Sequence, residues 1–180
     1  MRRSFGADSA ARLLPDGIAS HTACRVPRGL MASWSEFTAD APEMASFGKQ
    51  RLEGRIAYLA TIRPDGSPRV HPVSPFIAKD HLFVYMEPTS PKGDDLRRDA
   101  RYAMHSAVED NSGGQGEFLI RGRAVEVIHT AERKEAFEEA MTMGYRPQER
   151  HVLFELRIAE ALATVYEEGR PKRTRWRTGP

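Results

Sequence analysis

Between residues 56 and 128 the sequence consists of short runs with extended character, separated by residues that favour turns. The runs cover residues 56–62, 68–78, 80–86, 101–108 and 117–128. Pro64-Asp65-Gly66-Ser67 is a strong turn signal, and Lys79-Asp80 predicts a short hairpin. Strands that follow one another through hairpins, instead of alternating with helices, argue against a doubly wound parallel sheet. The pattern predicts a mainly β fold, and a small antiparallel barrel fits it best.

Flanking segments complete the predicted fold. Apolar residues at helical spacing predict a helix over residues 34–54, and further helices are expected at 94–98 and 130–143. Alternating apolar residues from Val152 predict a last strand over residues 151–167. The sequence therefore predicts six strands and three helices in one domain.

Charge is distributed unevenly along the 180 residues. Residues 1–30 hold five basic and two acidic residues without periodic patterning, so we expect a disordered N-terminal extension that contains Cys24, the single cysteine. Residues 31–168 are expected to form the folded domain, with 17 basic and 23 acidic residues. Residues 169–180 hold five basic residues and no acidic one, which predicts a basic tail. A net acidic folded part disfavours nucleic acid as a partner.

Hydropathy indicates where such a chain would reside. No run approaches the roughly 20 apolar residues that cross a bilayer, and no apolar segment of a signal peptide follows Arg2 and Arg3. A single cysteine excludes an intrachain disulfide and a multi-cysteine zinc site, and no His, Asp or Glu grouping has metal-ligand spacing. We therefore expect a cytoplasmic protein without a membrane partner and without a metal.

The second extended run, residues 68–78, is chemically unusual. Pro68, Pro72 and Pro75 each remove a backbone donor, so this run cannot be a fully paired interior strand. Two interpretations remain open at this point. The gaps could leave backbone groups free to meet a planar ligand, or the prolines could simply protect an edge strand from aggregation.

Residues 88–93 form a second candidate. Ser90 and Lys92 stand where a loop leads into a helix, and hydroxyl, ammonium and helix N–H groups together can hold a phosphate. Since the run that contains Arg69 is next to this loop through a hairpin, Arg69 and Lys92 could meet the same dianion.

Several segments, in this order and spacing, resemble one known family. They are Leu59-Ala60-Thr61-Ile62 before Asp65-Gly66, Pro68-Arg69-Val70-His71-Pro72-Val73, Leu82-Phe83-Val84-Tyr85 before Ser90-Pro91-Lys92, Asp95-Leu96-Arg97-Arg98-Asp99-Ala100-Arg101, and Gly116-Glu117-Phe118-Leu119-Ile120-Arg121-Gly122-Arg123-Ala124. The sequence thereby resembles the flavin-binding split-barrel family, which is typified by pyridoxamine 5'-phosphate oxidase and includes relatives that use a deazaflavin.

The resemblance implies a six-stranded antiparallel split β-barrel with peripheral helices and Greek-key topology, which forms homodimers with the cofactor between subunits. It implies FMN as cofactor, with coenzyme F-420 as the alternative. Phosphate contacts would come from Arg69, Ser90 and Lys92. The remaining implied cofactor contacts are the backbone of Val70, His71 and Val73, flanked by Tyr85 and Met86.

The resemblance also implies a function, and the positions at which this sequence differs from pyridoxamine 5'-phosphate oxidase limit the possible substrates. We expect a flavin-dependent oxidoreductase that transfers hydride or electrons to a small organic substrate, and we name no catalytic side chain. Pro91, Glu117 and Ser74 replace an arginine, a glutamine and a lysine of pyridoxamine 5'-phosphate oxidase, and the C-terminal substrate motif is absent, which argues against vitamin B6 oxidation. The alternatives are an F-420-dependent reductase and a non-catalytic flavin- or haem-binding protein. A structural role for His71 and His105 also stays open.

Overall fold

The computed structural model describes residues 31–111 and 113–179. The expected extension over residues 1–30, with Cys24, lies outside the described residues. In chain order the described elements are α1 Trp34–Asp40, α2 Pro42–Leu52, β1 Ala57–Ile62, β2 Pro68–Val73, β3 Phe76–Ala78, β4 His81–Met86, α3 Pro91–Arg98, β5 Arg101–Ser106, β6 Glu117–Glu126, α4 Thr130–Thr142, β7 Val152–Glu167 and β8 Arg170–Arg177.

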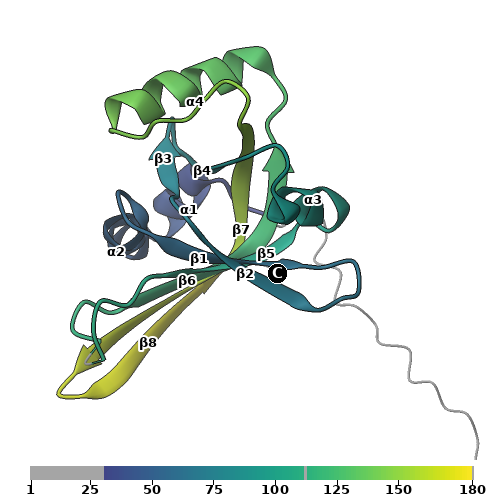
Figure 1. Cartoon of the computed structure of the whole chain (residues 1–180). Helices are drawn as coiled ribbons and strands as arrows, with labels where there is room; N and C mark the ends of the chain where they lie inside the picture. Colours follow the sequence, from purple (N-terminus) through teal and green to yellow (C-terminus); the bar gives the residue numbers. More distant parts are fainter. Residues whose placement is uncertain (1–30, 112, 180) are drawn as a thin grey trace, which may run out of the picture.

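The strands form one antiparallel sheet in the order β2-β1-β5-β6-β7-β4-β3, and β8 pairs with the C-terminal half of β7 (Figure 1). Its two end strands, β2 and β3, are consecutive in the chain and are joined only by Ser74 and Pro75. The sheet must therefore curl until its ends approach each other. No ladder joins β2 to β3 within the described part of the chain, so the sheet is not closed.

The expectation of a mainly antiparallel β fold is confirmed, but the predicted number of six strands is wrong: the described residues form eight. One reason is that the predicted run 68–78 changes partner in the middle. Val73 pairs with Ala57 of β1, whereas Phe76 pairs with Phe83 of β4. Periodicity cannot show this change, because both halves are extended.

The second additional strand is β8, in the segment that we expected to be a basic tail. Glu168 and Gly169 have positive φ values of 52° and 75°, which make a tight turn that leads from β7 directly into β8. Trp176 packs on Phe37 of α1 with ring centroids 4.8 Å apart and donates a hydrogen bond of 2.5 Å to Asp40. A strand with exposed, mostly basic side chains on both faces shows no alternation of polarity, so its sequence resembled a tail.

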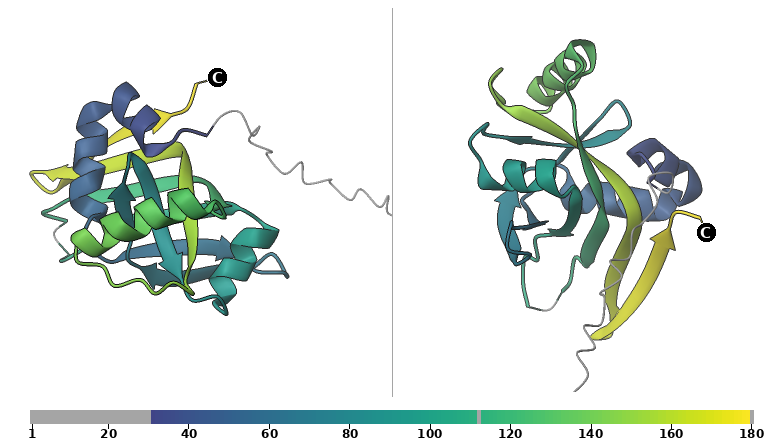
Figure 2. Two further views of the ribbon diagram at one scale, coloured as in Figure 1. Left: turned by 90° about the horizontal axis from the view of Figure 1, so that it is seen from above. Right: turned by 90° about the vertical axis from the view of Figure 1, so that its right-hand side faces the viewer.

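The helices cover different parts of the curled sheet (Figure 2). The predicted helix over residues 34–54 is two helices, since Ala41 breaks it and Pro42 begins α2; the capping residue of α1 is Ser33. Helices α1 and α2 pack over β7 and its neighbours, α4 over β3, and α3 beside β1. Among the described residues, no helix has the length and apolar composition that crossing a membrane requires.

The core lies between the inner face of the sheet and α1 and α2. It contains Phe37, Leu59, Met104, Phe118 and Ile120, each buried completely. A second apolar cluster under α4 includes Phe76 and Phe83. Since β4, β1 and β2 are anchored in this core, the residues that follow β4 and those on β2 have fixed positions relative to each other.

Candidate cofactor site

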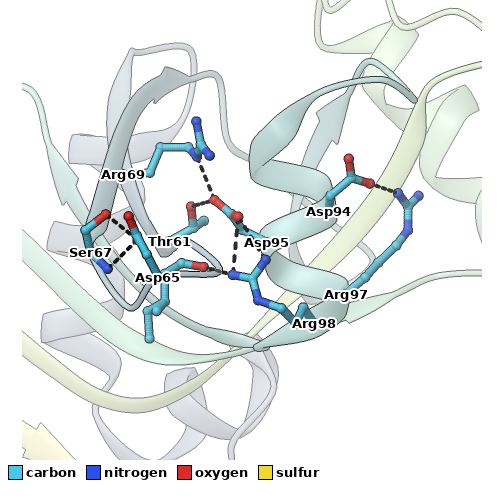
Figure 3. Close-up of polar contacts among 9 residues, drawn as sticks. Thr61, Asp65, Ser67, Arg69, Asp94, Asp95, Arg97 and Arg98 are labelled. Carbon is cyan, nitrogen blue, oxygen red and sulfur yellow. Dashed lines mark hydrogen bonds and ion pairs between the residues drawn. The ribbon is translucent and has the colours of Figure 1, made fainter.

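Arg69 extends from the edge strand β2 toward helix α3 (Figure 3). Its Nε atom donates a hydrogen bond of 2.6 Å to Oδ2 of Asp95, which is only 2% exposed. Thr61, the register partner of Arg69 on β1, donates its hydroxyl to the same oxygen at 2.9 Å. The hairpin β1–β2 and helix α3 thus meet at one buried carboxylate.

The other oxygen of Asp95 is occupied as well. Arg98, one turn farther along α3, places Nη1 and Nη2 both 3.3 Å from Oδ1. Burial alone would raise the pKa of Asp95, but the hydrogen bonds from Arg69, Thr61 and Arg98 outweigh it and hold the pKa below its ordinary value. Asp95 is therefore ionised at neutral pH.

The N-terminal turn of α3 carries the predicted phosphate-binding loop. Ser90 is the N-cap residue, and its side chain does not cap the helix but accepts a hydrogen bond of 2.9 Å from Nζ of Lys92. Burial lowers the pKa of Lys92. No carboxylate of the described residues forms an ion pair with Lys92, so its charge is not neutralised by a neighbour in this part of the chain.

His71 lies on the same face of β2 as Arg69, two residues along. Its pKa is lowered, first by burial and then by the positive charges of Lys92, Arg69 and Arg63. Three positive charges thus act on the pKa of this histidine, and the charge of Asp95 acts in the opposite direction. Such an excess of positive charge is what an anionic ligand would neutralise.

A hollow of about 380 Å³ opens next to these cations, and its size is typical of small-molecule sites. Its walls come from the ends of β2 and β4, from α3, and from the loop after α4. They are formed by Pro72, Val73, Ser74, Tyr85, Met86, Glu87, Lys92, Tyr145, Arg146, Pro147 and His151.

The structure brings together some of the eight predicted cofactor-binding residues and separates others. Val73, Tyr85, Met86 and Lys92 line the hollow. The other four lie around it. Arg69 forms the adjoining cation cluster together with Lys92, and His71 and Ser90 lie beside these two cations. Val70 is on the opposite face of β2 and is 60% exposed. Only the backbone of Val70 was predicted to contact the cofactor, and β2 is the edge strand that such a contact requires.

The wall after α4 was missed by the sequence analysis. Tyr145 donates its hydroxyl to the carbonyl of Pro75 at 2.6 Å, which attaches this loop to the β2–β3 junction. Glu87 accepts hydrogen bonds from Arg150 and His151, at 2.9 and 3.0 Å, and these bonds lower its pKa to about 2. The acid in the wall is therefore already neutralised by the loop. No local pattern indicates these contacts, since they join residues more than 60 positions apart in the chain.

A family model described as pyridoxamine 5'-phosphate oxidase matches residues 43–164. The chain belongs to the pyridoxamine 5'-phosphate oxidase family. This confirms the resemblance that the sequence showed, and the match covers all the strands from β1 to β6 and most of β7.

Solved structures agree with this assignment at the level of the fold. A nimC/nimA family protein from Clostridium acetobutylicum has a TM-score of 0.56 at 15% identity, covering 75% of this chain and 93% of that one. A heme binding protein from Mycobacterium smegmatis has a TM-score of 0.53 at 18% identity, covering 72% of this chain and 57% of that one. No curated protein matches the sequence.

The departures from pyridoxamine 5'-phosphate oxidase can now be placed in the structure. Ser74, which stands for a lysine, lines the hollow, so the hollow lacks that cation. Glu117, which stands for a glutamine, accepts a hydrogen bond of 2.7 Å from Tyr166 of β7 and lies on the outer face of the sheet. Membership of the family therefore does not imply that this chain acts on vitamin B6.

Proposed function

We propose that this chain is a flavin-dependent oxidoreductase that binds FMN, with the FMN phosphate at Arg69, Ser90 and Lys92. One observation carries the proposal: a cluster of cations with a single buried acid, Asp95, adjoins a hollow of small-molecule size. A phosphate dianion supplies the negative charge that this cluster lacks.

The phosphate end of FMN fits the residues present. Arg69 uses Nε for Asp95, and the described residues give its two Nη atoms no partner, so they are available to a ligand. Among the described residues, the ammonium of Lys92 donates a hydrogen bond to the Ser90 hydroxyl alone, and this hydroxyl can itself donate to an anion. Charge-assisted hydrogen bonds of this kind are the strong ones in phosphate recognition.

The ring end also fits. The Tyr85 hydroxyl is buried beside the hollow and has no hydrogen-bond partner among the described residues, which is unfavourable unless a ligand supplies one. Edge strand β2 leaves backbone groups unpaired on the side away from β1. FMN supplies hydride or electron transfer when it is bound, and the chain's own residues bind and orient it.

Coenzyme F-420 is the alternative, and its acidic tail would need further free cations. Arg97 and Arg98 are the nearest candidates on α3, but Arg97 is engaged by Glu126 and Asp94, and Arg98 by Asp95. Arg175 and Arg177 of β8 contact Glu160 on a different part of the sheet. The ion pairs on α3 support FMN over coenzyme F-420, and Arg146 of the hollow, which among the described residues donates to carbonyl groups, is the cation that an acidic tail would have to use there.

The chromophore released on denaturing the purified protein tests this proposal. We expect the yellow colour and green fluorescence of FMN, and reoxidation of the reduced protein by a small organic acceptor. Release of a deazaflavin would replace FMN by coenzyme F-420. Release of haem, or a bound flavin that never turns over, would contradict the oxidoreductase proposal.

We also propose that the protein works as a homodimer joined through the outer face of the sheet. Val70 and Tyr58 lie on this face with exposed fractions of 60% and 47%, and Ala60, Ala103 and Leu119 continue it across β1, β5 and β6. Apolar side chains that are exposed side by side on a sheet favour burial against another surface. A second copy would bury this face and bring its own outer residues near the edge strand β2.

Replacing Val70 with Asp should convert the dimer into a monomer, because the new carboxylate would be buried without a partner at the contact. The molar mass measured by light scattering after gel filtration checks this. Ile128→Asp is the matched control: Ile128 is 75% exposed but follows β6 toward α4, so its variant should stay dimeric. A dimeric Val70→Asp protein, or a wild-type monomer, would overturn the proposed contact.

A further inference from the structure

We propose that Asp95 is a positioning residue, which orients Arg69 toward the bound phosphate and fixes the distance between Arg69 and Lys92. The inference rests on the proposed function, since it assumes that a phosphate binds there. Asp95 was not among the residues that the sequence marked as cofactor-binding.

The orientation of Arg69 follows from which of its atoms is used. A guanidinium has five N–H donors, and Asp95 takes only the one on Nε, at 2.6 Å. The side chain of Arg69 is 19% exposed, whereas that of Asp95 is 2% exposed. The carboxylate therefore holds the inner edge of the guanidinium, and the Nη donors remain on the more accessible side.

Asp95 also connects the two elements that carry the phosphate ligands. It lies three residues after Lys92, on the same turn of α3, and its Oδ2 atom is bound by Thr61 of β1 and Arg69 of β2. Figure 3 shows these three side chains pointing toward one another from the hairpin and the helix. The turn that carries Lys92 is thereby fastened to the strand that carries Arg69.

The negative charge of Asp95 should repel an anionic ligand only weakly. Both of its oxygens are occupied by protein donors, with Oδ1 facing Arg98 and Oδ2 facing Thr61 and Arg69. Its negative charge is thus compensated by two guanidinium groups within 3.3 Å. The Nη donors of Arg69 therefore face the ligand with a fixed orientation, and they carry the positive charge that contacts it.

The test compares FMN with riboflavin, which differ only in the phosphate, using flavin fluorescence to measure Kd. Wild-type protein should prefer FMN by at least about tenfold. The variant Asp95→Asn keeps the shape and removes the charge. It should lose about tenfold in FMN affinity and keep the riboflavin affinity within about twofold, since only the phosphate contacts become misaligned.

Two further comparisons separate positioning from a general structural role. Asp94→Asn is the matched control, because Asp94 is the exposed neighbour on α3 and its ion pair within the described part of the chain is with Arg97. The variant should bind FMN as the wild type does. Adding Asp95→Asn to Arg69→Gln should cause a smaller further loss than Asp95→Asn causes alone, because the contact of Asp95 with Arg69 is already absent. Should Asp95→Asn fail to fold, Thr61→Val removes one hydrogen bond to the same oxygen and should give a smaller loss, again for FMN only.

Equal losses for FMN and riboflavin, or additive effects of the Asp95 and Arg69 variants, would overturn the positioning role. If Arg69→Gln weakens FMN binding and Asp95→Asn does not, this inference fails and the proposed function stands. If wild-type protein binds no FMN, the proposed function fails together with this inference.

Discussion

Replacing Arg69 with glutamine is expected to weaken FMN binding about 10- to 150-fold, which corresponds to roughly 1.5–3 kcal/mol for a hydrogen bond to a charged group. The reason is that Arg69 supplies the free Nη donors of the cation cluster, while its Nε contact with Asp95 is internal. Riboflavin affinity should not change, because riboflavin has no phosphate for Arg69 to contact. Fluorescence titration with both flavins measures the two affinities on the same preparation.

The matched control for this variant is Arg97→Gln. Arg97 also lies on the α3 side of the site, but its ion pairs are with Glu126 and Asp94 and not with Asp95 among the described residues. Its variant should bind FMN as tightly as the wild type. Unchanged FMN affinity in the Arg69 variant would remove Arg69 from the site.

The largest expected effect on stability comes from Gly122→Ala. Gly122 of β6 lies at the register irregularity opposite β7, where an added Cβ atom would fall 1.8 Å from the carbonyl oxygen of Arg157. Overpacking typically destabilises by about 1–3 kcal/mol, and here a backbone atom must move, so we expect a loss of about 3 kcal/mol or more. Urea unfolding followed by circular dichroism measures the free energy of unfolding.

Gly93→Ala is the control for steric crowding. A Cβ atom on Gly93 would lie 3.8 to 4.0 Å from its nearest neighbours, which is ordinary contact distance. Because Gly93 is in helix α3, alanine should be neutral or stabilise the protein by about 0.5–1 kcal/mol. A Gly122→Ala protein as stable as the wild type would show that β6 and β7 do not approach each other as described.

The sequence predicted those elements whose local pattern and tertiary role agree. β1, β4, β5, β6 and β7 fall within runs recognised from apolar residues and turn signals, because their inner faces are buried in the core. The change of partner between β2 and β3 depends on how the whole sheet curls, which no local pattern records. β8 is held by pairing with β7 and by the contact of Trp176 with Phe37, not by an apolar face of its own.

The residues of the candidate site also separate into those that the sequence predicted and those that it did not. Arg69, Ser90 and Lys92 were predictable because they lie in short segments with a recognisable order and spacing. The roles of Asp95 and Tyr145 were not, although Asp95 lies in one of these segments, since each acts through a contact with a residue distant in the chain: Asp95 with Arg69, and Tyr145 with Pro75. Residues that position other residues leave a weak signal in a single sequence.

The central claim is that the cations of β2 and α3 form a phosphate site beside a hollow of small-molecule size. Calorimetric titration of FMN into the full chain, after removal of any bound chromophore, tests it most directly. We predict saturable binding of one FMN per chain and much weaker binding of riboflavin. Correctly folded protein that gives no saturable heat with FMN, or that binds riboflavin equally well, would contradict the account.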